Sequence, residues 1–267
     1  ENRGQLIAWT GDPDADSAAS PCIVSSKAGY RGVENHLYRV EIHTGSQDRD
    51  GNSTTPTFKW SRDNGSVAAA WVGQEGDDLI VSDVPGSTRE FAAGQWVELI
   101  DDDLELRGEP GTMVKLVQVE GGALTIDPET ATGPVDWRPD LKHPKVRRWD
   151  HKEAEASGQP RGAIPVAEGI PIRLENGVWI QFEEAAEQQP GNQYRTGDYW
   201  LIPARTATGD VEWPQREDDQ GRLKPTAQPP HGVEHHYAPL AVVQAADDVV
   251  DLRRKFEPVW KHKIEDS

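Results

Sequence analysis

The sequence predicts a mainly β protein with an antiparallel sandwich or barrel architecture and little helix. Three observations carry this prediction: short runs of strand length recur between turn residues, apolar and polar residues alternate cleanly over 113–119, and Asn176-Gly177 separates two further runs. Alternation with a period of two places one face of a strand on a core. Asn-Gly tolerates the positive φ angles of a tight hairpin turn. We therefore expect sheets with one buried and one wet face.

The runs are rich in β-branched and aromatic residues and are bounded by Gly, Pro, Asn or Asp, which is the composition of strands and their turns. In chain order the predicted strands are 5–9, 37–42, 57–60, 67–72, 78–81, 95–100, 113–119, 123–126, 170–174, 178–182, 198–202 and 236–243. Gly121-Gly122 offers a hairpin turn between the seventh and the eighth of them. The best helix candidate is 248–256, near the end of the chain, closed by Pro258.

The spacing of these runs divides the chain into parts. Regularly spaced short strands predict a small barrel-like subdomain over 73–130. The stretch 131–165 is rich in Pro and charge, which predicts a long connection. Residues 1–72 and 140–247 are then expected to form a discontinuous main β domain, and 248–267 a C-terminal helix and tail.

The composition excludes several classes of partner. Among 267 residues, 28 Lys and Arg against 46 Asp and Glu give a formal net charge of -18. Such a field repels phosphate backbones and anionic head groups, so we expect no nucleic-acid partner. No apolar run approaches the roughly 18 residues of a spanning helix, which predicts a soluble chain without membrane insertion. Cys22 is the single cysteine, so no intrachain disulfide can form. Because the chain starts at Glu1 rather than Met, we expect a piece of a longer protein.

One Asp-rich loop has the spacing of a calcium site. Asp48, Asp50 and Asn52 stand at alternate positions, as in the first half of a calcium loop, whose hard cation takes several oxygen ligands. The acidic ligand that should follow is missing from Thr55-Pro56-Thr57-Phe58. A polar hairpin turn is therefore the favoured interpretation, with calcium as the alternative, and no other cofactor is expected.

No catalytic motif stands out in the sequence. It holds no Ser nucleophile elbow and no Gly-rich phosphate loop. A glycosidase needs two carboxylates about 5 to 9.5 Å apart, and 46 acids do not single out a pair. The candidates for acid and base chemistry are Glu34, Asp63, Glu234 and His235.

Three tryptophans lie in polar or Pro-rich segments, where an indole face would suit a sugar ring: Trp137, Trp149 and Trp213. A Trp beside Pro also closes the ends of β cores, and this second role is the favoured interpretation.

Four segments carry distinctive motifs: GYRGVENHLYRVEIH at 29–43, FKWSRDNGSV at 58–67, YRTGDYWLIPAR at 194–205 and GVEHHYAPL at 232–240. With these motifs the chain resembles, over roughly residues 22–243, an uncharacterised family of large bacterial proteins associated with phage-tail-like contractile injection systems. The resemblance implies other protein subunits as partners. It implies no catalytic residue, because none is established for the family.

The motifs mix Arg, aromatic residues and turn Gly, which suits buried pairs of Arg and carboxylate. Maintenance of the fold is the favoured interpretation. The alternative is that Arg31, Glu34, Arg62, Asp63 and His235 converge in a ligand-binding cleft.

The sequence therefore predicts a non-catalytic structural or binding module of a phage-tail-like or surface-associated bacterial assembly. We expect it to be assembled in the cytoplasm, to act outside the cell, and to contact other subunits or a surface glycan. The alternative rests on ten Trp and abundant carboxylates on a β scaffold. It is a glycan-directed hydrolase or lyase, or a carbohydrate-binding domain.

Overall fold

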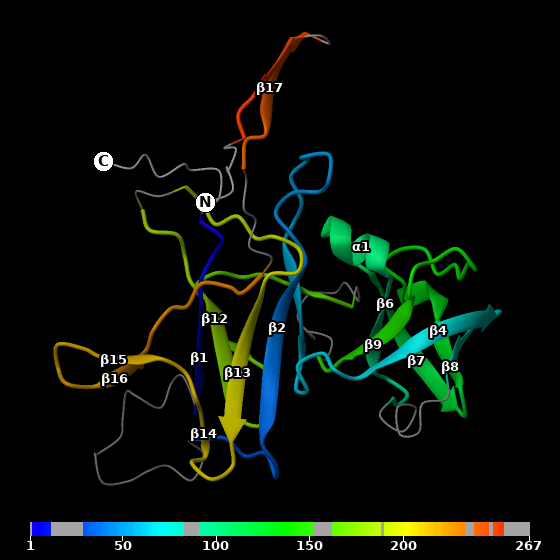
Figure 1. Ribbon diagram of the computed structural model, residues 1–267. Coiled ribbons are helices and arrows are strands. Elements are labelled where there is room, and N and C mark those ends of the chain that lie inside the picture. The colour runs from blue at the N-terminus through cyan, green and yellow to red at the C-terminus, as the bar shows by residue number, and fades with distance from the viewer. Residues whose placement is uncertain are drawn as a thin grey trace, which may run out of the picture. The chain divides into compact units, whose positions relative to one another are not determined.

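The computed structural model describes residues 2–11, 29–82, 91–151, 162–187, 190–232, 238–245 and 248–253. It confirms a mainly β protein built from antiparallel sheets (Figure 1). Helix within the described residues is confined to α1 (Asp102–Arg107) and a 3-10 turn at Pro128–Thr130. The chain divides into two compact units, Glu1–Gly232 and Val233–Ser267.

Two sheets of the first unit share one core. The larger has the strand order β10-β3-β2-β13-β14 and the smaller the order β1-β12-β11. Their bounds are β1 (Leu6–Thr10), β2 (His36–Thr44), β3 (Thr57–Ser61), β10 (Ile164–Pro165), β11 (Ile172–Arg173), β12 (Val178–Phe182), β13 (Tyr199–Arg205) and β14 (Asp210–Val211). Buried side chains of both sheets form a single cluster, in which the ring centroid of Phe182 lies 5.1 Å from that of Phe58 and 5.7 Å from that of Trp200. The two sheets therefore form a sandwich.

Six further strands of the first unit close into a barrel with the order β4-β5-β8-β7-β6-β9, and β15 (Gln215–Glu217) and β16 (Leu223–Pro225) pair as a separate two-stranded sheet. Their bounds are β4 (Ala68–Glu75), β5 (Asp78–Val81), β6 (Trp96–Ile100), β7 (Thr112–Glu120), β8 (Ala123–Asp127) and β9 (Lys145–Trp149). Its interior is a second core of Val, Leu, Ile and Trp side chains. In sequence the barrel is an insertion between β3 and β10, which pair with each other in the sandwich.

The barrel corrects the predicted division of the chain. It begins at Ala68 rather than at residue 73, and it includes Lys145–Trp149, which the sequence assigned to the connection 131–165. β9 pairs with β4 on one side and with β6 on the other, so it removes both open edges of the sheet. The Pro and charged residues around this strand obscured its pattern, because Lys145 and Arg147 occupy its partly exposed positions and the third cation, Arg148, is buried.

The second unit contains a hairpin of β17 (Ala241–Ala245) and β18 (Asp248–Asp251). The prediction of a helix over 248–256 is therefore wrong at its start, where the chain forms β18, and residues 254–267 lie outside the described part of the chain. Val249 and Val250 favour a strand because they are β-branched and pair with Val243 and Val242.

The turn between β11 and β12 depends on Gly177. Asn176 and Gly177 have φ values of 49° and 82°, as a two-residue hairpin turn requires. A Cβ atom at Gly177 would collide with the carbonyl oxygen of Gly29, whereas one at Gly76, with φ of 62°, meets nothing within 4 Å.

We predict that Gly177→Ala lowers the free energy of unfolding more than Gly76→Ala does. Both variants carry the cost of a left-handed backbone, about 1–2 kcal/mol. Gly177→Ala must in addition displace the backbone at Gly29, which should cost at least about 1 kcal/mol more. Urea denaturation of both variants measures the difference, and equal losses would contradict the prediction.

Candidate functional site

A cluster of buried charges joins the sandwich to the barrel. The ammonium of Lys59 on β3 binds the Oε1 atom of Glu98 on β6 and lies 3.2 Å from the Oε1 atom of Glu41 on β2. The side chains of Lys59 and Glu98 are 3% and 0% exposed. The Oε2 atom of Glu98 accepts a hydrogen bond of 3.0 Å from the indole of Trp149, and Lys59 lies over that ring. Every charge in this cluster is thus matched by a partner from another element.

The pKa of Glu98 reflects these partners. Burial alone would raise it, but the positive charge of Lys59 and the hydrogen bond from its ammonium hold the pKa well below its usual range. A carboxylate with a lowered pKa stays ionised at neutral pH. The cluster is therefore an ion pair in the native state.

Two histidines border the cluster and are kept neutral. Burial, with a contribution from the charge of Lys59, lowers the pKa of His43, whose Nε2 atom donates 3.0 Å to the carbonyl of Gly111. Burial also lowers the pKa of His151, to about 4, and its Nε2 atom donates to the carbonyl of Gly162. Each histidine thus ties together segments of the junction through a neutral ring.

A second ionic network lies at the same junction and contains two of the predicted site residues. Arg148 on β9 binds Asp63 at 2.6 Å and Asp150 at 3.1 Å. Arg62 donates its backbone N–H to Asp150 at 2.9 Å and its guanidinium to Glu175 at 2.8 Å. The network links the chain after β3, the end of β9 and the turn before β12. These contacts support the architectural interpretation of Arg62 and Asp63.

The other members of the predicted cleft are placed differently. Arg31 and Glu34 are exposed in the segment before β2. Arg31 donates its backbone N–H to Asn176 at 2.9 Å, next to the Glu175 that binds Arg62, and the carbonyl of Glu34 accepts from Tyr30. The predicted residues Glu234 and His235 lie outside the described residues.

The predicted calcium residues form a hydrogen-bonded turn. The Oδ1 atom of Asp48 accepts from the backbone N–H groups of Asp50 at 3.0 Å and Asn52 at 2.8 Å, and its Oδ2 atom accepts from the Asn52 amide at 2.9 Å. The carboxylate of Asp48 therefore holds the loop closed from within. Within the described ranges no group of three or more His, Cys, Asp or Glu is arranged to hold a metal ion.

The three tryptophans proposed as ligand platforms pack into the protein. Trp149 is 0% exposed and Trp213 is 9% exposed, so neither offers a free face to a sugar. Trp137 is half-buried against the barrel core and donates to the carbonyl of Trp71 at 3.2 Å. The burial of Trp149 and Trp213 argues against the alternative of sugar stacking on these two rings.

A stacked pair of tryptophans was not predicted from the sequence. Trp9 on β1 and Trp179 on β12 are cross-strand partners, with ring centroids 6.4 Å apart and planes inclined by 14°. Both are half-buried. Only the strand register brings them together, because they are distant in sequence.

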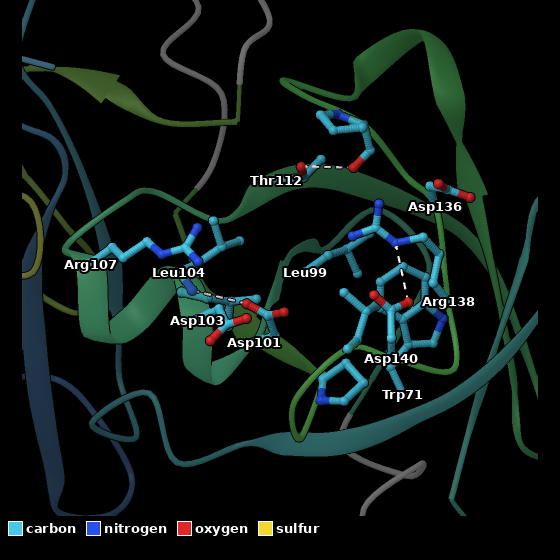
Figure 2. Close-up of a pocket in the computed structure, with 14 residues that line it drawn as sticks. Trp71, Leu99, Asp101, Asp103, Leu104, Arg107, Thr112, Asp136, Arg138 and Asp140 are labelled. Carbon is cyan, nitrogen blue, oxygen red and sulfur yellow. Dashed lines mark hydrogen bonds and ion pairs between the residues drawn. The ribbon is translucent and has the colours of Figure 1, made fainter. Parts of the chain in front are cut away.

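An open cleft of about 390 Å³ lies on the barrel beside α1. Figure 2 shows Asp101, Asp103 and Leu104 on its helix side and Arg138 and Asp140 on the side of the loop that leads to β9. Its apolar base includes Trp71, Leu99 and Leu141.

Local sequence explains the shape of the cleft. Asp101 caps α1 by accepting from the backbone N–H of Leu104 at 3.0 Å, and Gly108 ends the helix in a left-handed conformation. On the loop side Arg138 lies 3.7 Å from Asp140. Carboxylates and guanidinium groups around an apolar base can hold a polar ligand or a side chain of a partner.

These features define the class of the protein: a β sandwich with an inserted six-stranded antiparallel barrel, joined through buried charges. The chain belongs to a family of unknown function, DUF6519, whose model matches residues 3–262. No curated protein and no solved structure matches the chain. In the part of the chain that the structure describes, no helix is long and apolar enough to cross a membrane.

We predict that Lys59→Met destabilises the protein by about 3–5 kcal/mol, because it leaves the buried carboxylate of Glu98 without its cation. Lys145→Met is the matched control, since Lys145 pairs with Glu105 at 2.8 Å on the surface and should lose less than about 1 kcal/mol. Chemical denaturation measures both. The double variant Lys59→Met, Glu98→Leu should recover part of the loss, and a double variant no more stable than Lys59→Met would contradict the pairing.

We predict that stability falls as the pH decreases from about 6.5 to 5. The native pKa values of His43 and His151 lie below those of the unfolded chain, about 6.5, so the unfolded state binds protons first. Each histidine should contribute up to about 1.4 kcal/mol per pH unit. The slope of unfolding free energy against pH, and NMR titration of the imidazoles, measure this. Native His151 protonating near pH 6.5 would contradict it.

Proposed function

We propose that this protein is a non-catalytic binding or structural module of a phage-tail-like or surface-associated bacterial assembly. The observation that carries the proposal is the hairpin of β17 and β18 in the second unit. Its six large apolar residues are 45–64% exposed: Leu240, Val242, Val243, Val249, Val250 and Leu252.

A two-stranded hairpin with exposed valines on both faces needs a partner. Val242 pairs with Val250 on one face, and Val243 pairs with Val249 on the other. An isolated hairpin is marginally stable in water, and clustered exposed apolar residues mark interaction sites. Association with another subunit would remove these side chains from water and order the hairpin.

The buried charges of the first unit fit the same role. Lys59, Glu98, Arg62 and Asp150 bind one another or backbone groups at the junction of sandwich and barrel. These charged groups hold the sandwich and the barrel in one relative orientation. Such a role suits a structural component better than an enzyme. Two of these residues, Lys59 and Arg62, lie in the motif at 58–67, which is one of the motifs that carry the resemblance to the contractile-system family.

The test is cosedimentation with particles of the bacterium that carries the gene. We expect the tagged chain to sediment with phage-tail-like particles and the double variant Val242→Asp, Val243→Asp to stay in the supernatant, because two carboxylates oppose burial of the hairpin. Val72→Asp, Val117→Asp is the matched control, since these strand valines of the barrel are 49% and 50% exposed. A wild-type chain that never sediments would overturn the proposal.

A further inference from the structure

We propose that the pair of tryptophans on the outer face of the smaller sandwich sheet binds an acidic saccharide, whose pyranose rings carry carboxylates. The site consists of Trp9 on β1, Trp179 on β12 and Arg173 on β11, and is here called the tryptophan platform. It belongs to the first unit and is therefore independent of the hairpin that carries the proposed function.

Strand register places the three side chains in one row. Trp179 lies opposite Trp9 on one side and opposite Arg173 on the other, so the row crosses all three strands of the sheet. Side chains of β12 alternate between the two faces of the sheet. Val178 and Ile180 are buried in the sandwich core, so Trp179 lies on the outer face. A site built on strands holds its side chains at a fixed spacing.

The two indoles form one aromatic surface with unused polar groups. Their planes are inclined by only 14°, their ring centroids lie 6.4 Å apart, and both side chains are half-buried. Neither indole N–H has a hydrogen-bond acceptor within the described part of the chain. Cross-strand packing explains the contact between the two rings. It leaves both N–H donors available to a ligand.

The groups beside the rings select an acidic ligand. Arg173 is exposed, and its guanidinium has no ion-pair or hydrogen-bond partner among the described residues. A guanidinium and an indole N–H donate hydrogen bonds and accept none. A row of donors requires a ligand with acceptors, and a carboxylate is the acceptor that a guanidinium binds in bidentate geometry.

The aromatic surface selects a saccharide among the ligands that carry a carboxylate. The C–H groups on one face of a pyranose ring carry partial positive charge and pack on the negative face of an aromatic ring. The next cross-strand pair is Ile7 and Gln181, and the amide of Gln181 binds Glu183 at 2.9 Å. Two half-buried rings and one isoleucine expose far less than the roughly 800 Å² per partner of a standard protein interface. The platform therefore suits a short saccharide better than a protein.

The net charge of the chain limits the length of the ligand. A formal net charge of -18 repels a long polyanion. At physiological ionic strength charges interact over about 8 Å, so a short saccharide on the rings responds mainly to the nearest charges. Arg173 is the charge that strand register places next to Trp179. Short acidic oligomers are therefore the expected ligands.

Calorimetric titration of the full chain tests the inference with short oligomers of galacturonate, glucuronate, mannuronate and guluronate. The matched ligands are the same oligomers with each carboxyl group reduced to a primary alcohol, which keeps the sugar rings and removes the charge. At least one acidic oligomer should bind, and its reduced form should bind at least about tenfold more weakly, because it loses the charge-assisted hydrogen bonds to Arg173. Failure of all four acidic oligomers to bind, or equal binding of an acidic oligomer and its reduced form, would overturn the inference.

Three variants locate the site. Arg173→Gln, at an exposed position, should weaken binding of the acidic oligomer at least about tenfold and should bind the acidic and reduced forms equally. Trp179→Ala should weaken binding of both forms, because stacking does not require the carboxylate. Trp137→Ala is the matched control, since Trp137 is also half-buried but packs on the barrel and donates to the carbonyl of Trp71. An Arg173→Gln chain with wild-type affinity, or equal losses in the two tryptophan variants, would place the saccharide elsewhere.

Discussion

The pair of Lys59 and Glu98 is the interaction on which the arrangement of the first unit depends. Both side chains are buried, so neither can find water if the other moves away. Lys59 belongs to the sandwich and Glu98 to the barrel, and the cost of an unpaired buried charge is several kcal/mol. A docking of barrel on sandwich that is shifted by a few ångströms would break this pair. The charges therefore specify one geometry between two bodies that each have their own apolar core.

Apolar and polar contacts have different roles at this junction. The sandwich and the barrel are each stabilised by burial of Val, Leu, Ile and aromatic side chains. Between them stands a small cluster of Trp96, Met113 and Trp149, and around it lie the ion pairs and the two neutral histidines. Apolar burial has little directional preference, whereas hydrogen-bonded charges have strict geometry. The cores thus supply stability, and the junction supplies orientation.

Strand patterns and turn chemistry were readable from the sequence because both are local. The alternation over 113–119 corresponds to β7, and Asn176-Gly177 is the turn before β12. The closure of the barrel could not be predicted from the sequence, because β9 is recognised as a strand by its pairing with β4 and β6 rather than by its own composition. The pair of Lys59 and Glu98 was equally hidden. Each is an ordinary charged residue in a strand, and only the fold brings them together across 39 positions.

Burial of charge and exposure of apolar surface occur in the same chain, and the contrast favours a role in a larger assembly. A protein selected only to be soluble would place Val242 and Val250 inside and Lys59 outside. Here the first unit offsets its buried charges internally, through partners from neighbouring strands. The hairpin of the second unit has no such internal compensation in the described residues, because two strands cannot cover both of their faces. Its exposed valines therefore support the proposal that a partner outside the hairpin covers them.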